Sequence, residues 1–535
     1  MALIMTMIIV VIMLVLIGSM LGVITGELHS VSFAGFDNRA LYSADAGVQF
    51  AQQQIDNYAL NNATPPPSAS WTQSLPADPS GVKASFTVNL DPTPFLRNGN
   101  LYYLVHSEGT APGGGDRKVD AILEVQSYTH YAYYTYQNEN GNYFVSGINS
   151  FDGPVYLQGT SSKLNIQWYN INKPIFLSTA VIAGNYGFSP STPTTNSQWT
   201  QVIAGGSANL TQTSKVGYVP YPPIGSTYIA ANQAYNGTTG NSSLPSAGSN
   251  DVYINGGLAK NGSGPLTSGI YIQGNVAIAM TSPTATTEVF TINPVTAASL
   301  STYAATYSID YLNTIPTQTI VTVDYTAGTT HVDEGTKHVT YTGVPQNPPT
   351  GSTATQNGSI FVNGNVDSIA GTLNGQFTLA VPDIQTSSSS NVKDIIATGN
   401  ISYKADPTAG ASDDVLGMMC NNFKLGPAAI TPNTIKIQSD IIAGNQYEAT
   451  HSLPDGGFGT VDNPNSMPLK TSVNIFGSVI QNEVKPLGMF DMNSGNLIKG
   501  WSDTYNYDTR QMTPPDWPTL GTGLVAWKDA GSPAY

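Results

Sequence analysis

The amino-acid sequence predicts a mainly β protein with one long N-terminal α-helix. An antiparallel meander is expected to pack on that helix, and a parallel β-helix, or solenoid, with loop insertions is expected to follow. Three observations lead to this prediction. No charged side chain occurs before Glu27. The chain combines 53 Gly, 35 Pro and 29 Tyr with only 10% charged residues, which is typical of an exposed β protein with many turns. Short strand-like segments recur after residue 128, and several end in Asn-Gly or Gln-Gly.

The N-terminal segment is long enough to span a bilayer. Residues 1–26 exceed the roughly 20 apolar residues that cross the hydrocarbon core as a helix. A cleaved signal peptide is the alternative, but no Lys or Arg precedes the apolar run and the run merges into a patterned helix, so we expect a retained helix. Gly18, Gly22 and Gly26 form a small-xxx-small series, which permits close helix packing and weakens the helix enough to predict local unwinding at residues 18–26.

Residues 27–60 continue the helix as an amphipathic half. Apolar residues follow one another at spacings of three and four, which places them in one stripe with a single polar member, Asn38. Three prolines at residues 65–67 predict that the helix ends before them, so the helical region is residues 1–62. The predicted stripe consists of Leu28, Val31, Ala34, Asn38, Leu41, Ala44, Val48, Ala51, Ile55 and Tyr58.

Residues 63–128 contain three strand-like segments separated by turn-rich connections. The segments are 82–90, 101–110 and 118–128. Their short connections predict an antiparallel meander that buries one face against the second half of the helix.

Residues 129–535 repeat an apolar–aromatic–apolar–Asn/Gln–Gly pattern, at 155–159, 252–256, 270–274 and 360–364. Gly and Asn tolerate positive φ, so such segments suit the corners of a parallel β-helix; a β-sandwich remains the alternative. Two insertions are expected, near 189–249 as loops and short hairpins and near 281–351 as a projecting hairpin or small subdomain. Residues 501–535 are expected to cover the last coil.

The charge and the motifs argue against several classes of function. A net charge of −15 with 19 Lys and Arg gives no basic surface for nucleic acid. The single cysteine, Cys420, lies in an apolar run and is expected to be a buried, inert thiol. Walker A, GxSxG and dinucleotide-binding motifs are absent from the sequence, so we expect neither enzyme activity nor a cofactor.

Two groups of residues are candidates for binding. Asp406, Asp413 and Asp414 lie on one predicted loop, and clustered carboxylates can bind Ca²⁺. Their spacing does not match an EF-hand and Asp is an ordinary turn residue, so we expect no metal there. A dense run of tyrosines at 128–143 could stack on sugars, but aromatic packing between the meander and the solenoid is favoured.

The N-terminal residues carry a resemblance to a known family. Met1-Ala2-Leu3-Ile4 opens the uncharged run, and Ala40-Leu41-Tyr42-Ser43-Ala44-Asp45-Ala46-Gly47-Val48 follows in the helix. Together they resemble the N-terminus of type IV pilins, especially the minor-pilin type with its A-x-x-A-E/D-A-G signature. The resemblance implies that Met1 is a processed and methylated N-terminus. Most major pilins have Glu at the fifth mature position, whereas this chain has Met5 followed by Thr6, so the usual amine–carboxylate assembly contact lacks its carboxylate.

The C-terminal half is similar to uncharacterised β-helical regions joined to pilin-like N-termini, at 358–379, 413–417 and 474–508. The resemblance implies a structural subunit that polymerises with identical copies into an extracellular type IV pilus-like filament. Before assembly the subunit would be held in the inner membrane, where it would contact the pilus assembly machinery. The β-rich part would face outward, where glycans and other surfaces are further partners. A minor pilin or pseudopilin at a filament tip or priming complex, and a membrane-anchored polysaccharide-binding β-helix, are the alternatives. The implied assembly residues are Met1, Ala2, Leu3, Ile4, Met5, Thr6, Gly18, Gly22, Gly26 and Glu27.

Overall fold

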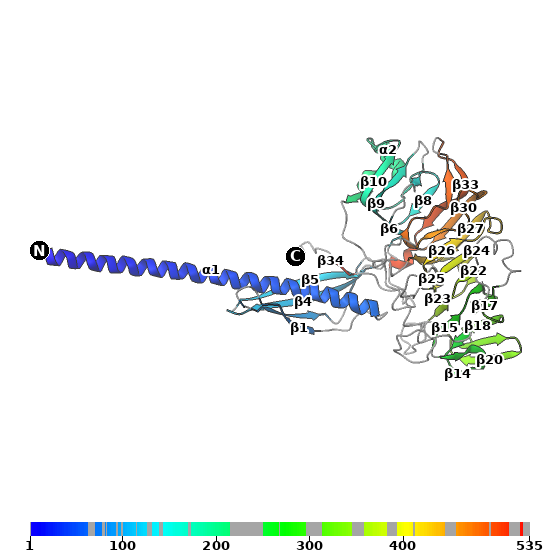
Figure 1. Ribbon diagram of the computed structural model, residues 1–535, viewed down its shortest axis with the longest axis horizontal. Helices are drawn as coiled ribbons and strands as arrows, with labels where there is room; N and C mark the ends of the chain where they lie inside the picture. The colour runs from blue at the N-terminus through cyan, green and yellow to red at the C-terminus, as the bar shows by residue number, and fades with distance from the viewer. Residues whose placement is uncertain are drawn as a thin grey trace. The chain divides into compact units, whose positions relative to one another are not determined.

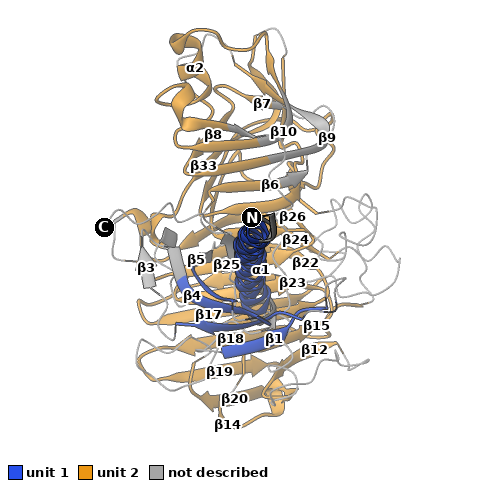
Figure 2. Cartoon of the chain, turned by 90° about the vertical axis from the view of Figure 1, so that its left-hand side faces the viewer, with its two compact units in different colours: residues 1–59, 64–126, 525–535 blue, residues 60–63, 127–524 orange. Residues whose placement is uncertain are grey.

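The computed structural model divides the chain into two compact units, which Figure 2 colours separately. Unit 1 comprises residues 1–59, 64–126 and 525–535, and unit 2 comprises residues 60–63 and 127–524. Unit 2 is therefore inserted in the sequence of unit 1. The structure describes residues 2–527 apart from 62–69, 78–80, 82, 92–94, 98–99, 114, 126–130, 138–142, 169–172, 214–249, 267, 296–312, 345–357, 382–392, 410–411, 445–455, 492–493 and 513–524.

Unit 1 begins with the helix α1 (Ala2–Asn61), which runs without a break (Figure 1). The predicted long helix is confirmed, and its end before Pro65 agrees with the exclusion of proline from helix interiors. The predicted unwinding at residues 18–26 is wrong for this chain, because single glycines weaken a helix by only about 1 kcal/mol each and long apolar neighbours favour it.

The rest of unit 1 is an antiparallel sheet in the order β1-β2-β4-β5-β34, with β3 paired to β4. The predicted meander is confirmed by β2, β4 and β5. The C-terminal strand β34 pairs with β5, whereas the sequence predicts that the C-terminus covers the last solenoid coil; that expectation is wrong for β34. The strands are β1 (Ser70–Ser74), β2 (Ser85–Leu90), β3 (Phe95–Arg97), β4 (Asn100–Ala111), β5 (Gly115–Val125) and β34 (Val525–Trp527).

The second half of α1 packs on this sheet through small residues. Val48, Ala51 and Ile55 are buried among apolar side chains of β2, β4 and β5. The approach is closest at Gly109 of β4, where a Cβ atom would lie 2.0 Å from the Ala40 carbonyl oxygen. The sheet and helix are also joined by a hydrogen bond of 2.6 Å from the Ser43 hydroxyl to the Ser85 carbonyl. The contact side chains and glycines on α1 are Ala40, Ser43, Ala44, Gly47, Val48, Ala51 and Ile55.

The predicted helix stripe is therefore wrong in its first half. Leu28, Val31 and Leu41 are exposed, and the buried face begins only at Ala40. It includes Ser43 and Gly47, which a search for apolar spacing passes over. The pattern fails there because close contact between a helix and a sheet requires small side chains rather than large apolar ones.

Unit 2 is built on two long sheets, and from β21 onward the chain passes repeatedly from one to the other. Figure 1 shows the strands of this unit. The first, sheet B, is parallel from β11 to β15 and is extended by the antiparallel strands β12 and β13. In spatial order its strands are β11 (Leu210–Thr213), β10 (Ala180–Ser189), β9 (Val155–Gln167), β6 (Tyr133–Gln137), β31 (Val479–Glu483), β28 (Asp440–Ala443), β25 (Val415–Cys420), β23 (Gln376–Val381), β21 (Ser359–Asn363), β15 (Ile270–Gln273), β12 (Asp251–Ile254) and β13 (Gly257–Leu258), with β7 (Tyr143–Val145) paired to β9.

The second sheet, sheet C, is also parallel where it belongs to the coils. In spatial order its strands are β14 (Gly264–Pro265), β20 (Lys337–Thr342), β19 (Thr329–Glu334), β18 (Thr319–Asp324), β17 (Thr287–Pro294), β16 (Val276–Thr281), β22 (Val366–Leu373), β24 (Asp394–Tyr403), β27 (Thr434–Gln438), β30 (Leu469–Phe476), β33 (Leu497–Asn506) and β32 (Gly488–Phe490); β26 (Asn422–Leu425) pairs with β24 and β29 (Phe458–Thr460), and β8 (Asn149–Asp152) pairs with β33. These parallel coils confirm the predicted solenoid, and the antiparallel sandwich is excluded.

The coils are not stacked in the order of the sequence. The chain enters the stack at β6 and β8, continues through β9, β10 and β11, and resumes at the opposite end with β12. It then returns coil by coil until β31 pairs in parallel with β6, and β33 with β8. The last coil thus lies against the first one, at a junction that we call the seam.

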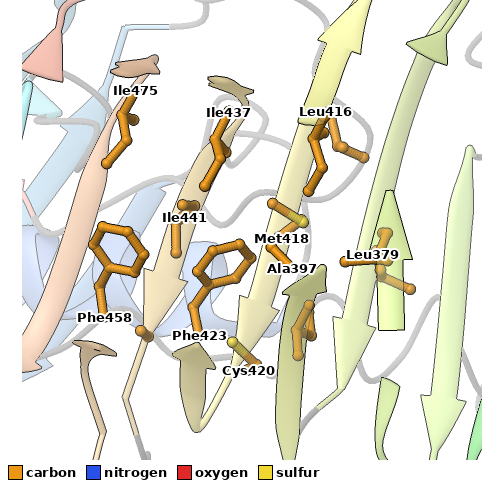
Figure 3. Packing of buried hydrophobic residues seen from close by; sticks show 14 of the residues in the cluster. Leu379, Ala397, Leu416, Met418, Cys420, Phe423, Ile437, Ile441, Phe458 and Ile475 are labelled. Carbon is orange, nitrogen blue, oxygen red and sulfur yellow. The ribbon is translucent and has the colours of Figure 1, made fainter. Parts of the chain in front are cut away.

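Equivalent apolar residues of successive coils lie side by side, as parallel pairing in register requires. Figure 3 shows part of this packing, including Leu379, Met418 and Ile441. The inner row consists of Ile270, Ile360, Leu379, Met418, Ile441, Val479, Tyr133, Val155 and Ala180. On the opposite face of sheet B the residue that follows each member of the inner row is also buried, except Val181 in β10, which is half-buried. Most of these strands therefore appear in the sequence as continuous apolar runs.

The two predicted insertions differ in structure. Near 281–351 the strands β17 to β20 form an antiparallel meander that continues sheet C, as the alternating sequence indicates. Near 189–249 the structure contains a short helix, α2 (Asn196–Val202), which the sequence analysis misses. Its capping box of Thr195 and Gln198 was a usable signal. Residues 214–249 lie outside the described residues.

Candidate functional site

The first half of α1 exposes apolar side chains on all sides. Between Met7 and Ile17 every residue is a large apolar one, and every one is exposed, so none of the described residues covers a face of the helix there. A helix that is apolar all round belongs in a membrane or in the core of a larger assembly. The exposed side chains, with 47–72% of their surface accessible, are Ile4, Met7, Ile8, Ile9, Val10, Val11, Ile12, Met13, Leu14, Val15, Leu16, Ile17, Met20, Leu21, Val23, Ile24, Leu28, Val31 and Phe33.

The hydroxyl groups of Ser19 and Thr25 are paired inside the helix. The Ser19 hydroxyl donates to the Leu16 carbonyl at 2.9 Å, and the Thr25 hydroxyl donates to the Leu21 carbonyl. Because α1 also satisfies its own backbone groups, residues 7–26 present little to water that would be lost on transfer into hydrocarbon. We call the exposed apolar residues 4–33 the stem.

The structure places the predicted assembly residues along the stem. Ile4 is exposed. The backbone of Ala2, Leu3, Met5 and Thr6 belongs to α1, but their side chains lie outside the described set. Met1 lies outside the described residues. Glu27 is exposed and is the first charged residue.

Gly18, Gly22 and Gly26 lie in open space. A Cβ atom at any of the three positions would meet nothing within 4 Å. Within one chain, therefore, neither packing nor backbone conformation requires glycine there, in contrast to Gly47 and Gly109 in the packed half of the unit.

The candidate metal ligands are held in turns by hydrogen bonds. Asp406 is exposed and accepts bonds from the backbone and hydroxyl of Thr408, which lower the pKa of its carboxyl. Asp414 is buried and accepts from the backbone N–H groups of Gly375 at 2.6 Å and Ala405 at 3.0 Å, while Asp413 is exposed. Within the described part of the chain, no three His, Cys, Asp or Glu side chains are gathered so as to hold a metal ion.

Three of the other singled-out residues, Cys420, Tyr133 and Tyr134, are packed in the interior. Cys420 is buried as predicted, and burial raises the pKa of its thiol. Tyr133 packs against Phe151 and Tyr505 inside the coils, and Tyr134 stacks on Tyr156 with ring centroids 5.0 Å apart. These tyrosines therefore pack within the solenoid itself.

A buried carboxyl that sequence analysis misses lies near Asp414. Glu288 in β17 has no exposed surface, and its Oε2 accepts bonds from the Ser282 hydroxyl at 2.6 Å and the Asn374 N–H at 2.8 Å. Burial raises the pKa of Glu288 to about 8, although these two hydrogen bonds act in the opposite direction. Alternation in β17 places residue 288 on the buried face, but only the fold brings Ser282 and Asn374 to it.

Replacing Glu288 with glutamine is expected to flatten the pH dependence of stability. The folded state keeps a proton on Glu288 that the unfolded chain loses near pH 4.5, so wild-type stability should fall as the pH rises from about 5 to about 8. The free energy of unfolding of the glutamine variant should fall less over this pH range. The difference from wild type should be a few kcal/mol at most, since each pKa unit corresponds to about 1.4 kcal/mol. Urea unfolding at pH 5, 6.5 and 8 measures both slopes. Asp503, whose pKa is raised to about 6 by burial, contributes equally to both proteins. Parallel curves would contradict the assignment.

The length and composition of α1, and three comparisons with known proteins, complete the description of the stem. Among the described residues, α1 is the one helix long and apolar enough to cross a membrane, judged by length and composition, and such a helix near the N-terminus is typical of membrane association or of a signal sequence. Comparison with protein-family models, curated proteins and solved structures gives no match. The resemblance to pilins thus rests on the residues alone.

Proposed function

We propose that this protein is a structural subunit of an extracellular type IV pilus-like filament, assembled through the stem. The observation that carries the proposal is the set of apolar side chains exposed on every side of α1 from Met7 to Ile24. The stem would lie in the inner membrane before assembly and against the stems of identical subunits afterwards. The two β-rich units would be displayed outside, and we assign no catalysis to any residue.

The energetics support assembly through the stem. Burying one Val, Leu or Ile side chain contributes roughly 1.5–3 kcal/mol, so the stem as a whole represents tens of kcal/mol of hydrophobic stabilisation if it leaves water. Lipid and neighbouring stems are both apolar, so moving from one to the other costs little. Whether the stem stays in lipid or joins other stems then depends on how closely the helices pack. Gly18, Gly22 and Gly26 are the residues that would allow the closest packing.

Replacing Gly22 with leucine is expected to reduce filament yield severely while the β units stay folded. A Cβ atom at position 22 meets nothing within 4 Å, so the fold is expected to tolerate leucine, but the larger side chain would hold neighbouring stems apart. Sheared filaments are quantified by immunoblotting against the membrane-bound pool, and Val23→Leu, which adds bulk beside the glycine without removing it, is the matched control. Equal filament yields for both variants would remove the glycines from the assembly surface.

Shearing followed by electron microscopy with antibodies to the solenoid tests the function itself. Filaments labelled along their length, with the chain abundant in the sheared fraction, would support the proposal. Trace recovery with label at the tips would replace it with a minor pilin or priming subunit. Recovery in membranes alone would replace it with an anchored binding protein that does not polymerise.

A further inference from the structure

A cavity of about 490 Å³ lies within unit 2 at the seam. It forms where the last coil, with β31 and β33, meets the first, with β6 and β8. Most of its wall is aromatic or aliphatic, and the exposed residues Asn465 and Pro486 at its rim show that it opens to solvent. A volume of this size and an apolar wall are typical of small-molecule sites. The aromatic lining residues are Tyr133, Phe144, Phe458, Phe490, Trp501 and Tyr505.

A carboxylate belongs to the wall of this cavity. Asp503 in β33 is only 7% exposed; its Oδ1 accepts a hydrogen bond from the Asn149 side chain, and its Oδ2 accepts one from the Tyr505 hydroxyl at 3.0 Å. Neutral groups thus hold the carboxylate in place, and within the described part of the chain no basic side chain forms an ion pair with it. Burial raises the pKa of Asp503 to about 6, which still leaves the group mainly ionised at neutral pH.

The basic residue of the cavity has other partners. Lys485 lines the cavity, but its Nζ donates to the Asn422 side chain at 2.9 Å and lies 3.9 Å from a Glu483 carboxylate oxygen. The cavity therefore contains a buried negative charge with no positive charge assigned to it. Burial of an ion without a counter-ion is costly, and a bound cation would offset that cost.

The rings around Asp503 are fixed and suited to a cation. Tyr133 and Tyr505 pack with centroids 4.9 Å apart, and Tyr133 meets Phe144 edge-on at 5.9 Å. Aromatic faces attract ammonium groups by about 0.5–2 kcal/mol, and their edges and faces also pack on an apolar body. An anion would be repelled by Asp503, and a saccharide would find few polar partners in a wall of this composition.

We propose that the seam cavity binds a small organic cation, an amine with an apolar body, whose ammonium group pairs with Asp503. The ammonium would complete the carboxylate's set of partners, and the aromatic wall would cover the apolar body. The inference concerns unit 2 alone and is independent of assembly through the stem.

Isothermal titration calorimetry of the full chain in detergent tests the proposal with three probes of one shape: benzylammonium, benzyl alcohol and benzoate. At pH 7.5 benzylammonium is expected to bind at least about tenfold more tightly than benzyl alcohol, which matches about 1.4 kcal/mol for one charge contact, and benzoate is expected not to bind. Fluorescence of Trp501 in the cavity wall gives a second readout. Equal binding of the three probes, or no binding of benzylammonium at millimolar concentration, would overturn the proposal.

Two further measurements assign the binding to Asp503. The Asp503→Asn variant should lose about tenfold in affinity for benzylammonium and not for benzyl alcohol. For wild type, lowering the pH from 7.5 to 5 should weaken benzylammonium binding by about fivefold, because Asp503 is then mostly protonated but not completely so. The other groups around the carboxylate in the cavity wall are Tyr133, Tyr505, Asn149 and Lys485. Burial raises the pKa of both tyrosine hydroxyls further above 10, so these hydroxyls stay neutral over this range. The pH measurement uses the wild-type protein, so it remains a valid test even if the Asp503→Asn variant fails to fold. Affinity that is independent of pH would overturn the proposal.

Discussion

Replacing Gly109 with valine is expected to disrupt the packing of α1 on its sheet, at a cost of about 3 kcal/mol or more. A Cβ atom at this position would lie 2.0 Å from the Ala40 carbonyl oxygen and 2.4 Å from the Ala44 nitrogen. Both are backbone atoms of the helix, so no side-chain rotation relieves the clash and the helix must move. Overpacking usually costs 1–3 kcal/mol, and a displaced helix belongs at or above the upper end of that range.

Limited proteolysis and thermal unfolding of the full chain in detergent measure this effect. In the valine variant, residues 40–55 of α1 should become sensitive to protease, and the transition of unit 1 should occur at lower temperature. Gly35→Ala is the matched control, because a Cβ atom there meets nothing within 4 Å and alanine favours the helix by up to about 1 kcal/mol. A valine variant as resistant as this control would show that the helix does not approach β4 so closely.

Replacing both Val11 and Val15 with aspartate is expected to abolish binding of the purified chain to vesicles. The two positions lie one helical turn apart in the stem and are exposed, so no neighbour within the chain can pair with the new charges. A carboxylate at the centre of a spanning helix costs about 2.5–3.5 kcal/mol, and two on one face repel each other further. Together they should lower the vesicle-bound fraction by at least tenfold.

Flotation of the chain with vesicles on a density gradient measures the bound fraction directly. Val11→Leu with Val15→Leu keeps the stem apolar and should float like wild type. Equal flotation of the aspartate variant would show that the chain binds lipid through a surface other than the stem, and the proposed use of the stem in the membrane would then be wrong.

The sequence predicts the elements of this fold better than their arrangement. The prolines after residue 64 and the alternation in β4 and β5 are local signals, so the helix end and the meander can be predicted without knowledge of the fold. The aromatic motifs at 270–274 and 360–364 also predict neighbouring strands, and the structure pairs Tyr271 with Phe361 in register. The contact of α1 with the sheet is predicted less well, because Ala40, Ser43 and Gly47 are selected for small size and not for hydrophobicity.

The chemical groups of unit 2 show why sites are harder to predict than strands. Asp414 stands out in the sequence beside Asp413, yet its carboxylate is occupied by backbone N–H groups that the fold brings from residues 375 and 405. No sequence pattern marks Asp503 as a site residue, because the cavity around it exists only where coils distant in the sequence meet. Burial and the identity of neighbours from distant parts of the sequence decide both cases, and neither property is local.

The seam also has a consequence for how the chain is made. Gln481 in β31 and Tyr133 in β6 hydrogen-bond across the seam although they are 348 positions apart in the sequence. At a synthesis rate of about 5–20 residues per second, one edge of β6 waits on the order of 20–70 s on the ribosome for its native neighbour. During that interval β31 from another nascent copy is chemically equivalent to the missing strand. Correct folding therefore depends on keeping nascent chains apart, and exchange of the last coil between copies is the misfolding route that this order of coils creates.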